Sequence, residues 1–455
     1  MIKIGMVADD VTGATTSGVL LSRSSVRTGV FFDEVLAENS NIKHNLDCIV
    51  ISSNSRALSK EDSYFKVQKS TRLLKKMGAK YFSKRIDTTL RGGIGTEIDA
   101  MLDVLGDDYV AIVVPAMPES RRILVGGYSV IDNVPLIETD VANDVKTPVK
   151  ENYIPKLISE QTSRKTGFID LSTVISGTEE IINKIDLEIS KGNKIIIIDA
   201  ITDKHINIIA KSLVKTGLNI LTVDPGPLTN KYAFYKNIAK KQVENIPKNI
   251  EIDESKTVIV CAGSATSVTK SQVDHLLEDN NNKKISLNPY KLIEKDSKNA
   301  LNEIKRALDI AITYLNNKSN PKSIILETAL SGQKINLEKE DSKRGYEHGK
   351  CSERINISLG LLVSEIYQNN PNCISGIYCT GGDTMLNVCK QMGVSMIEVK
   401  DYIIPQVDVS FQVGVNNGLP MVGKGGLTGD IDIINKIIDR LNLEYTFKEK
   451  ENEKK

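Results

Sequence analysis

Short runs of aliphatic and β-branched residues alternate with longer amphipathic runs along most of this 455-residue chain. Such alternation is typical of an α/β fold, in which mainly parallel strands form a sheet flanked by helices. In the first half the runs predict strands at residues 2–8, 27–32, 48–52, 81–86, 109–114 and 194–199. They predict helices at residues 16–24, 60–77, 95–105, 178–190 and 205–216. The run RILVGGYSVIDNVPL (122–136) differs, because its Gly-Gly and Asp-Asn pairs predict a hairpin inserted at the sheet edge.

The length of the chain favours two domains, and its polarity indicates where they divide. The segment KKQVENIPKNIEIDESK is polar, irregular and interrupted by proline, as interdomain linkers are. A second α/β series follows it, with predicted strands at 257–261, 324–327, 376–378 and 395–399. We therefore expect two mainly parallel α/β domains with the active site in the cleft between them. The predicted parts are a first domain (1–240), a linker (241–256), a second domain (257–441) and a frayed tail (442–455) that ends in KEKENEKK.

The composition narrows the possible partners and location. A formal net charge of +1, with charges well mixed, gives no field for nucleic acid or membrane binding. The six cysteines form no CxxC pair and there are only four histidines, which argues against a structural zinc site. The N-terminus has no signal-like segment, and no apolar run approaches the roughly 20 residues of a membrane span. We expect a soluble cytoplasmic protein.

Two polar clusters follow the first and third predicted strands of the first domain. Asp9 and Asp10 come directly after strand 2–8, at the edge where open α/β sheets bind ligands. They could accept substrate hydroxyls, act as a base or bind Mg²⁺, although a turn with a helix cap would use the same residue types. Arg56 follows strand 48–52 as part of Asn-Ser-Arg. Its planar fork suits a carboxylate, whereas a solvated loop arginine is the ordinary alternative.

A third cluster, KRIDTTLRGG, begins at Lys84 and crosses from a predicted strand into a loop. Strand alternation places Lys84, Ile86 and Thr88 on one face, and Arg85 and Asp87 on the other. An ion pair between Asp87 and Arg91 would be a purely structural explanation. We favour a ligand site, because so many polar groups are unusual where a sheet is normally apolar.

The second domain contains three glycine-rich turns between strands and helices, CAGSATS (261–267), YCTGGDT (378–384) and GKGGLTGD (423–430). Small residues let backbone amides approach an anion at a helix N-terminus. Lys424 could neutralise phosphate charge, and Asp430 could hold a metal or cap the last helix. Each turn alone is weak evidence, but three together favour a nucleotide site. Neither a Walker A motif nor a GxGxxG fingerprint is present, so this is not an ordinary P-loop or Rossmann site.

These motifs resemble those of the four-carbon acid sugar kinase family. ADDVTGA (8–14) is similar to the family's ADDLTGA, and KRIDTTLRGGIGTEIDA (84–100) to its K-x-IDSTLRGN-x-x-x-EI-x-A segment. VVPAMPESRRILVGGY (113–128) and ETDVANDVKTPV (138–149) resemble its VPAFPENGRT…GGY and F-A-x-D-x-x-x-PV stretches. CAGSATSVTKSQV, CTGGDT and GKGGLTGD resemble its GS-x-S-x-x-T-x-x-Q, GGDTA and K-x-GGFGD motifs. The resemblance runs in order from residue 2 to about residue 434.

The resemblance implies transfer of the γ-phosphoryl group of ATP, with Mg²⁺, to the terminal hydroxyl of threonate, erythronate or a 3-oxo-tetronate. It implies a substrate side formed by Asp9, Asp10, Arg56, Lys84, Asp87, Thr88 and Arg91. It implies an ATP side formed by Ser264, Gly381, Gly382, Asp383, Thr384, Lys424, Gly425 and Gly426. It also hints at a homo-oligomer.

Several positions depart from the family pattern and leave the particular sugar acid open. Thr88-Thr89 stands where Ser-Thr is usual, Gly93 where Asn is common, and Leu427-Thr428 where Phe-Gly is frequent. Thr15-Thr16-Ser17 stands where many members carry an Ala/Asn-Asp step, which bears on specificity if that Asp touches substrate.

The division of labour within the site also stays open. Arg56, Lys84 or Arg91 would clamp the carboxylate, and Asp10 or Asp87 would orient and deprotonate the hydroxyl. The metal ligands are not identified. Two other functions remain as alternatives: a dehydrogenase or aldolase of the same acids, and a non-catalytic sugar-acid sensor.

Overall fold

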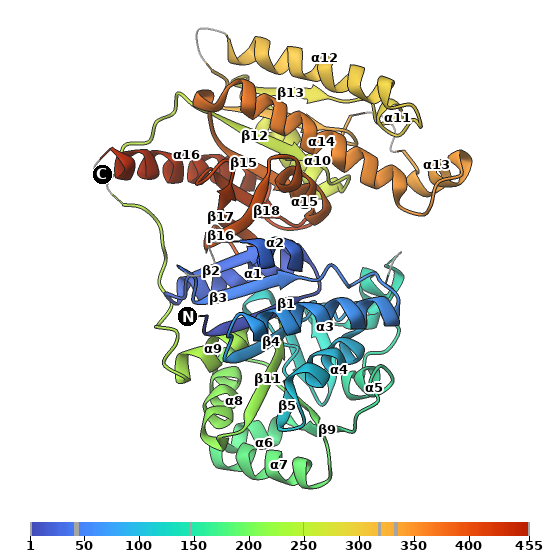
Figure 1. Cartoon of the computed structure of the whole chain (residues 1–455), viewed down its shortest axis with the longest axis vertical. Helices are drawn as coiled ribbons and strands as arrows, with labels where there is room; N and C mark the ends of the chain where they lie inside the picture. Colours follow the sequence, from blue (N-terminus) through green and yellow to red (C-terminus); the bar gives the residue numbers. More distant parts are fainter. Residues whose placement is uncertain are drawn as a thin grey trace. The chain divides into compact units, whose positions relative to one another are not determined.

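The computed structural model describes residues 2–40, 45–144, 147–248, 250–316, 320–331 and 335–453. The chain divides into two compact units, Met1–Glu244 and Asn245–Lys455, and each contains a sheet flanked by helices (Figure 1). The predicted α/β class with a mainly parallel sheet is therefore confirmed. The exact domain limits and the position of the active site relative to the two domains stay predictions. Within the described residues, no helix is long and apolar enough to cross a membrane.

The first unit is built on a sheet of parallel strands. Their order is β2 (Thr28–Phe31), β3 (Cys48–Ser52), β1 (Ile4–Ala8), β4 (Tyr81–Arg85), β11 (Asn219–Asp224), β5 (Tyr109–Val113), β10 (Ile195–Ile198) and β9 (Thr166–Ile169). The predicted strands differ from these only at their ends. Strands β9 and β11 are not among the predicted ones, because polar residues interrupt or flank the short apolar run in each.

The helices of the first unit pack against this sheet. They are α1 (Val11–Arg23), α2 (Glu34–Asn39), α3 (Lys60–Lys76), α4 (Ile94–Leu105), α5 (Ile154–Ser159), α6 (Leu171–Ser176), α7 (Thr178–Ser190), α8 (Asp203–Thr216) and α9 (Pro227–Tyr235). Helix α1 begins five residues before the predicted Thr16, because the side chain of Asp10 caps it by accepting a hydrogen bond from the Gly13 amide. Buried aliphatic residues of β5, β10, α7 and α8 form much of the core beneath α7 and α8.

The predicted hairpin is present as strands β6 (Arg122–Val125), β7 (Tyr128–Ile131) and β8 (Val134–Pro135). These strands form a small antiparallel sheet of their own instead of extending the edge of the main sheet. The buried Asp199 carboxylate explains the placement, since it accepts hydrogen bonds from the Gly126 and Gly127 amides at 2.7 and 3.0 Å. Both glycines have positive φ (59° and 77°), which lets their amides converge on one carboxylate.

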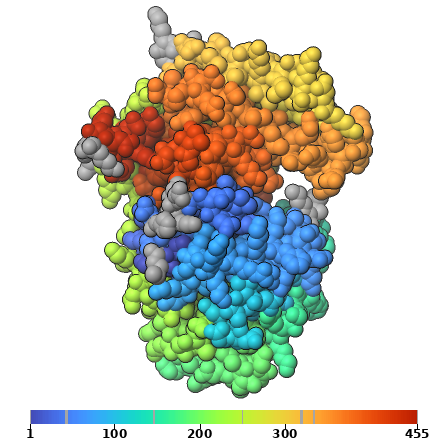
Figure 2. Space-filling view, in the orientation of Figure 1, coloured from blue at the N-terminus to red at the C-terminus, as the bar shows by residue number. Residues whose placement is uncertain are grey.

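The sheet of the second unit combines parallel and antiparallel strands. The order is β13 (Asn282–Ser286), β14 (Ser323–Glu327), β12 (Thr257–Ala262), β15 (Ile374–Thr380), β18 (Pro420–Lys424), β17 (Val407–Gly414) and β16 (Val394–Tyr402). The first five strands of this order, β13, β14, β12, β15 and β18, are parallel. Strand β17 runs antiparallel to both β18 and β16. Its helices are α10 (Ser267–Leu276), α11 (Pro289–Leu292), α12 (Ser297–Leu315), α13 (Leu337–Arg344), α14 (Lys350–Asn369), α15 (Gly382–Gln391) and α16 (Ile433–Asn452). The side chains of α14, orange in Figure 2, cover part of the visible face of this unit.

The segment from residue 442, expected to be a frayed tail, is instead the second half of helix α16 up to Asn452. Asn442 accepts a hydrogen bond from Ser375 Oγ at 2.6 Å. Glu444 is completely buried and pairs with both Lys400 and Arg440, at 2.6 and 2.9 Å. These tertiary contacts hold a segment whose local composition is polar enough to predict disorder.

Candidate functional site

The register of the parallel strands brings the three polar clusters of the first unit together. Ala8, the last residue of β1, lies opposite Ser52 at the end of β3 and Arg85 at the end of β4. The residues that follow these strands therefore emerge at one edge of the sheet, as carboxyl ends of neighbouring parallel strands do.

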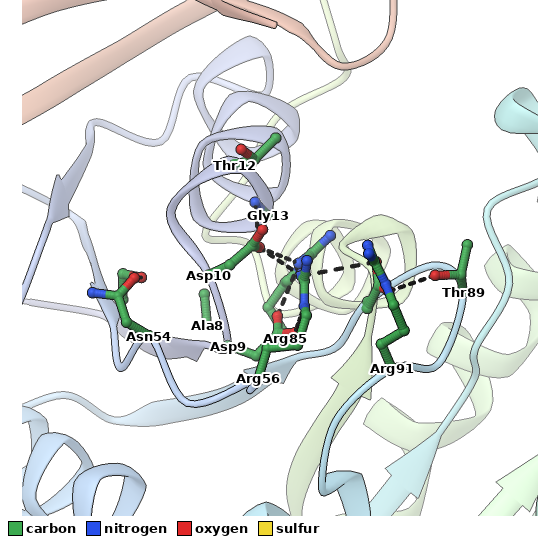
Figure 3. A network of polar contacts seen from close by, with 12 residues as sticks. Ala8, Asp9, Asp10, Thr12, Gly13, Asn54, Arg56, Arg85, Thr89 and Arg91 are labelled. Carbon is green, nitrogen blue, oxygen red and sulfur yellow. Dashed lines mark hydrogen bonds and ion pairs between the residues drawn. The ribbon is translucent and has the colours of Figure 1, made fainter. Parts of the chain in front are cut away.

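Asp9 and Asp10 each contact both Arg56 and Arg85 (Figure 3). The Asp9 carboxylate accepts from Arg56 Nε at 2.6 Å and from Arg85 Nη1 at 2.9 Å. Asp10 Oδ1 lies 2.8 Å from Arg85 Nη1 and 2.8 Å from Arg56 Nη2, and it also accepts the capping bond from Gly13. Asp10 thus caps helix α1 and takes part in the charged cluster, so the two explanations offered by the sequence hold together.

Asp87 extends this cluster toward a third arginine, Arg91. Its Oδ2 accepts from Arg91 Nε at 2.6 Å and from Thr89 Oγ1 at 2.5 Å, and its Oδ1 lies 3.8 Å from Arg56 Nη2. Arg91 also pairs with Asp144 at 3.2 Å. The structural ion pair between Asp87 and Arg91 therefore exists, and it is one part of a larger network.

The charges of the network shift the pKa values of its members. Burial alone would raise the pKa of the Asp9 carboxyl, but Arg56, Arg85 and Lys84 outweigh it and lower that pKa to about 2. The pKa of Asp87 is lowered in the same way, because Arg56 and Arg91 outweigh its burial. Both carboxylates are therefore ionised throughout the physiological range, and each is a weak base.

Arg85 belongs to this network although the sequence analysis did not name it as a site residue. The signal was available, because strand alternation placed Arg85 on the same face as Asp87. The space for its side chain comes from Gly13: a Cβ atom there would lie 1.6 Å from Arg85 Nη1. A glycine in the first turn of α1 is therefore required for the arginine to reach both aspartates.

Lys84 and Thr88, two other predicted substrate residues, are placed differently. The Lys84 side chain is fully buried, and its Nζ pairs with Glu97 at 2.7 Å and donates to the carbonyl of Arg85 at 2.7 Å. Its ammonium is therefore already neutralised within the unit. Thr88 is partly exposed beside Asp87. Substrate contact by either residue stays a prediction.

In the second unit, the register of β12, β15 and β18 brings the three glycine-rich turns together. Ala262 lies opposite Thr380, and Thr380 lies opposite Lys424, so the three turns start at neighbouring strand ends. The Gly381 amide donates to the Lys424 carbonyl at 3.0 Å and links two of the turns directly. All predicted ATP residues therefore lie at one sheet edge of this unit.

Hydroxyl groups at the start of α10 hold the last glycine turn in place. Thr266 and Thr269 donate to the Gly426 carbonyl at 2.8 and 3.0 Å. Ser264 packs against the same turn, since a Cβ at Gly426 would lie 2.3 Å from its Oγ. Gln272 Nε2 contacts the carbonyls of residues 428, 429 and 430 at 3.0–3.1 Å. The third turn is therefore fixed by side chains of the first turn and of helix α10.

Lys424 is the buried cation of this edge. Only 2% of the residue is exposed, and its Nζ donates to the carbonyls of Gly425 and Thr428 at 2.9 and 3.0 Å. Burial lowers the pKa of Lys424 to about 8. The ion pairs found among the described residues include none with Lys424, so an anion bound at these turns would meet a positive charge that no carboxylate balances.

The N-terminus of α15 offers backbone donors to the same place. Gly381 precedes the helix with a φ of 105° and provides no side-chain cap. Thr384 does not cap it either, because its hydroxyl donates to Asn356 Oδ1 at 2.8 Å. A Cβ at Gly263 would lie 1.9 Å from Thr384 Oγ1, so the first turn also depends on a glycine. Asp383 is exposed in the first turn of the helix. Uncapped amides at a helix N-terminus are suited to phosphate.

Among the residues that the structure describes, no group of three or more histidine, cysteine, aspartate or glutamate side chains is arranged to hold a metal ion.

The fold and the two edges are those of a two-domain α/β protein whose second edge is suited to a phosphate-bearing ligand. Family models agree: the description "sugar-binding N-terminal domain" matches residues 4–232, and "nucleotide-binding C-terminal domain" matches residues 259–434. A D-erythronate kinase of Heliobacterium modesticaldum is 33% identical over 97% of both chains. A D-threonate kinase of Salmonella typhimurium is 24% identical over 93% of this chain and 95% of its own. The chain belongs to the four-carbon acid sugar kinase family.

Solved structures agree on the fold. A Salmonella typhimurium protein superposes with a TM-score of 0.77 at 19% identity, over 96% of this chain and 99% of its own. Haemophilus influenzae protein HI1011 superposes with a TM-score of 0.68 at 21% identity, over 97% of this chain and 98% of its own.

Proposed function

We propose that this protein is an ATP-dependent kinase that phosphorylates the terminal hydroxyl of a four-carbon sugar acid, with D-erythronate as the first candidate. The observation that carries the proposal is the end-to-end similarity to a D-erythronate kinase, at 33% identity over 97% of both chains. Family membership also favours a kinase over the dehydrogenase, aldolase and sensor alternatives.

The proposed sugar-acid site is the edge of the first unit that carries Asp9, Asp10 and Asp87. Carboxylates and guanidinium groups in a fixed network can recognise hydroxyls and orient them without rearrangement during the reaction. Phosphoryl transfer depends mainly on such positioning and on charge neutralisation.

Of the three aspartates, we assign the hydroxyl-orienting role to Asp10. Its side chain is 28% exposed, compared with 4% for Asp9 and 6% for Asp87. The contacts that Asp10 makes to other described side chains and to the Gly13 amide all use Oδ1. Oδ2 is therefore the oxygen that can accept the proton of an incoming hydroxyl. Asp87 then serves to hold Arg56 and Arg91 in position.

The proposed ATP site is the edge of the second unit. Amides at the start of α15 and the turn around Gly425 and Gly426 would face phosphate oxygens, and Lys424 would supply positive charge. Mg²⁺ belongs to the proposal as the usual companion of ATP phosphates, held through one or two carboxylates and the phosphates themselves.

The proposal is tested by a coupled assay of ADP release with Mg-ATP and a panel of acids. The panel contains D- and L-erythronate, D- and L-threonate and the 3-oxo-tetronates. Turnover with one of these acids, and its strong loss in Asp10→Asn, would support both the kinase and the role of Asp10. ATP binding without turnover on any acid would show that the substrate class is wrong, and an absence of ATP binding would refute the kinase.

A further inference from the structure

The cations that the sequence analysis offered as carboxylate clamps are already paired inside the first unit. Arg56 contacts Asp9 and Asp10, Arg91 contacts Asp87, and Lys84 contacts Glu97. A bound sugar acid adds one further negative charge to an edge where arginines and aspartates already balance each other. An anion in such a place needs a cation that is not yet committed.

Arg122 is such a cation. It is the first residue of β6, and its Nη1 donates to the carbonyl of Ser120, a neutral group. Within the described parts of the chain, its Nε is buried without a hydrogen-bond partner, and so is the hydroxyl of Ser120 beside it. Two unsatisfied polar atoms in one short loop are unusual, because buried polar groups are nearly always paired.

The backbone holds Arg122 rigidly at the carboxyl edge of the main sheet. Its carbonyl accepts from the Met117 amide at 2.9 Å, and its amide donates to the Met117 carbonyl at 3.2 Å, which closes the loop that follows β5. Two residues further on, Leu124 exchanges backbone hydrogen bonds of 3.0 and 3.1 Å with Ala200, just after β10. The guanidinium thus starts from a fixed point among the loops at the carboxyl ends of the strands.

The neighbouring Arg121 provides a natural contrast. It has a left-handed φ of 54°, and its side chain is 79% exposed and pairs with Asp132 at 2.9 Å. The two consecutive arginines thus have opposite environments, one solvated and paired, the other partly buried without a carboxylate partner among the described residues.

Electrostatics connects Arg122 with the aspartate network. Burial lowers the pKa of the Arg122 guanidinium, and the charges of Asp132 and Asp87 oppose that effect, so Asp87 lies within electrostatic reach. Because Arg121 pairs with Asp132, the guanidinium of Arg122 has no carboxylate partner among the described residues that would neutralise it.

We infer that Arg122 binds the carboxylate of the sugar acid and thereby selects a four-carbon acid over the corresponding uncharged polyol. This inference rests on the proposed function. The planar guanidinium can offer parallel N–H donors to a carboxylate, and the Arg122 side chain as a whole is only partly buried. Lys424 in the second unit supplies the cation for phosphate, so the two anions have separate cationic residues.

The test compares Arg122→Ala, Arg122→Lys and the matched control Arg121→Lys, which keeps the charge that faces Asp132, in steady-state kinetics with the best acid and with erythritol, its uncharged analogue. We expect Arg122→Ala to raise the KM for the acid roughly 10- to 100-fold, the range for a lost hydrogen bond to a charged group. The KM for ATP, the kcat with the acid and the kcat/KM for erythritol should stay within about twofold. Arg122→Lys should recover part of the loss, and Arg121→Lys, which can still pair with Asp132, should behave as the wild type.

Other outcomes overturn the inference. A fall in kcat with an unchanged KM for the acid would place Arg122 with the phosphoryl group, and unchanged kinetics would make it an ordinary surface arginine. An equal loss of kcat/KM with the acid and with erythritol would indicate a structural role. Thermal unfolding curves of the variants, which should match that of the wild type, test for such a role. If the wild type itself turns over no four-carbon acid, the proposed function fails first, and that result is recognised before any variant is made.

Discussion

Replacement of Lys424 by methionine tests whether the sheet edge of the second unit, the proposed ATP site, holds a buried ammonium group that no carboxylate balances. In the folded protein the pKa of Lys424 is about 8, against 10.5 for an ordinary lysine, because the ammonium is buried. A difference of about 2.5 pKa units corresponds to about 3 kcal/mol. By this amount the protonated Lys424 side chain destabilises the folded state. Methionine has nearly the same length and carries no charge, so the Lys424→Met variant lacks this titration.

The expected effect has a definite direction and pH window. Below pH 8 the lysine is protonated in both the folded and unfolded states, so the stability difference between wild type and variant is constant. Between pH 8 and pH 10.5 only the unfolded state keeps the proton, so wild-type stability rises relative to the variant by up to about 3 kcal/mol. The variant also loses the hydrogen bonds from Lys424 to the carbonyls of Gly425 and Thr428. This loss shifts the difference in unfolding free energy equally at every pH and does not change its slope against pH.

The measurement is urea unfolding followed by far-UV circular dichroism, since the chain contains no tryptophan. Wild type and variant are compared at pH 7.5, 8.5, 9.5 and 10.5. Cysteines and tyrosines of the unfolded chain also lose protons in this range, but they are common to both proteins and cancel in the difference. A difference that stays flat through pH 10 would refute the argument that Lys424 is an unpaired buried ammonium. Turnover should be lost in the variant, and the pH dependence should weaken when Mg-ADP is bound.

Three further substitutions test the geometry of the two edges. Gly13→Ala should displace Arg85, because the new Cβ would lie 1.6 Å from Nη1, and calorimetry should show weakened sugar-acid binding while ATP binding is unchanged. Gly263→Ala should weaken ATP binding and leave sugar-acid binding unchanged, because its Cβ would lie 1.9 Å from Thr384 Oγ1 at the start of α15. Each glycine variant is thus the control for the other. Asp87→Asn should lower kcat/KM by roughly 100-fold with an unchanged circular dichroism spectrum, since Arg56 and Arg91 lose the charge that positions them; near-normal activity would remove Asp87 from the site.

Much of the fold follows from local patterns in the sequence. The predicted strand Cys48–Ser52 and helix Thr178–Ser190 have the observed limits, because each is a continuous run bounded by turn residues. The strand-end positions of Asp9, Arg56 and Asp87 were enough to bring them to one sheet edge, since parallel strands present their carboxyl ends together. The three glycine-rich turns of the second unit lie at one sheet edge for the same reason, because they follow the parallel strands β12, β15 and β18.

Tertiary structure decided what these residues contact. Lys84 and Arg85 are adjacent in sequence, yet one pairs with Glu97 inside the unit and the other with two aspartates, because successive side chains of a strand point to opposite faces. Residues 442–452 have a polar composition and are nevertheless helical, and Asn442 and Glu444 anchor the start of this segment through partners distant in sequence. Sequence alone thus determined many of the strands and helices and the edge where the polar groups emerge. Which charges are neutralised and which remain available depended on long-range packing, because ion pairs form between side chains that only the folded chain brings together.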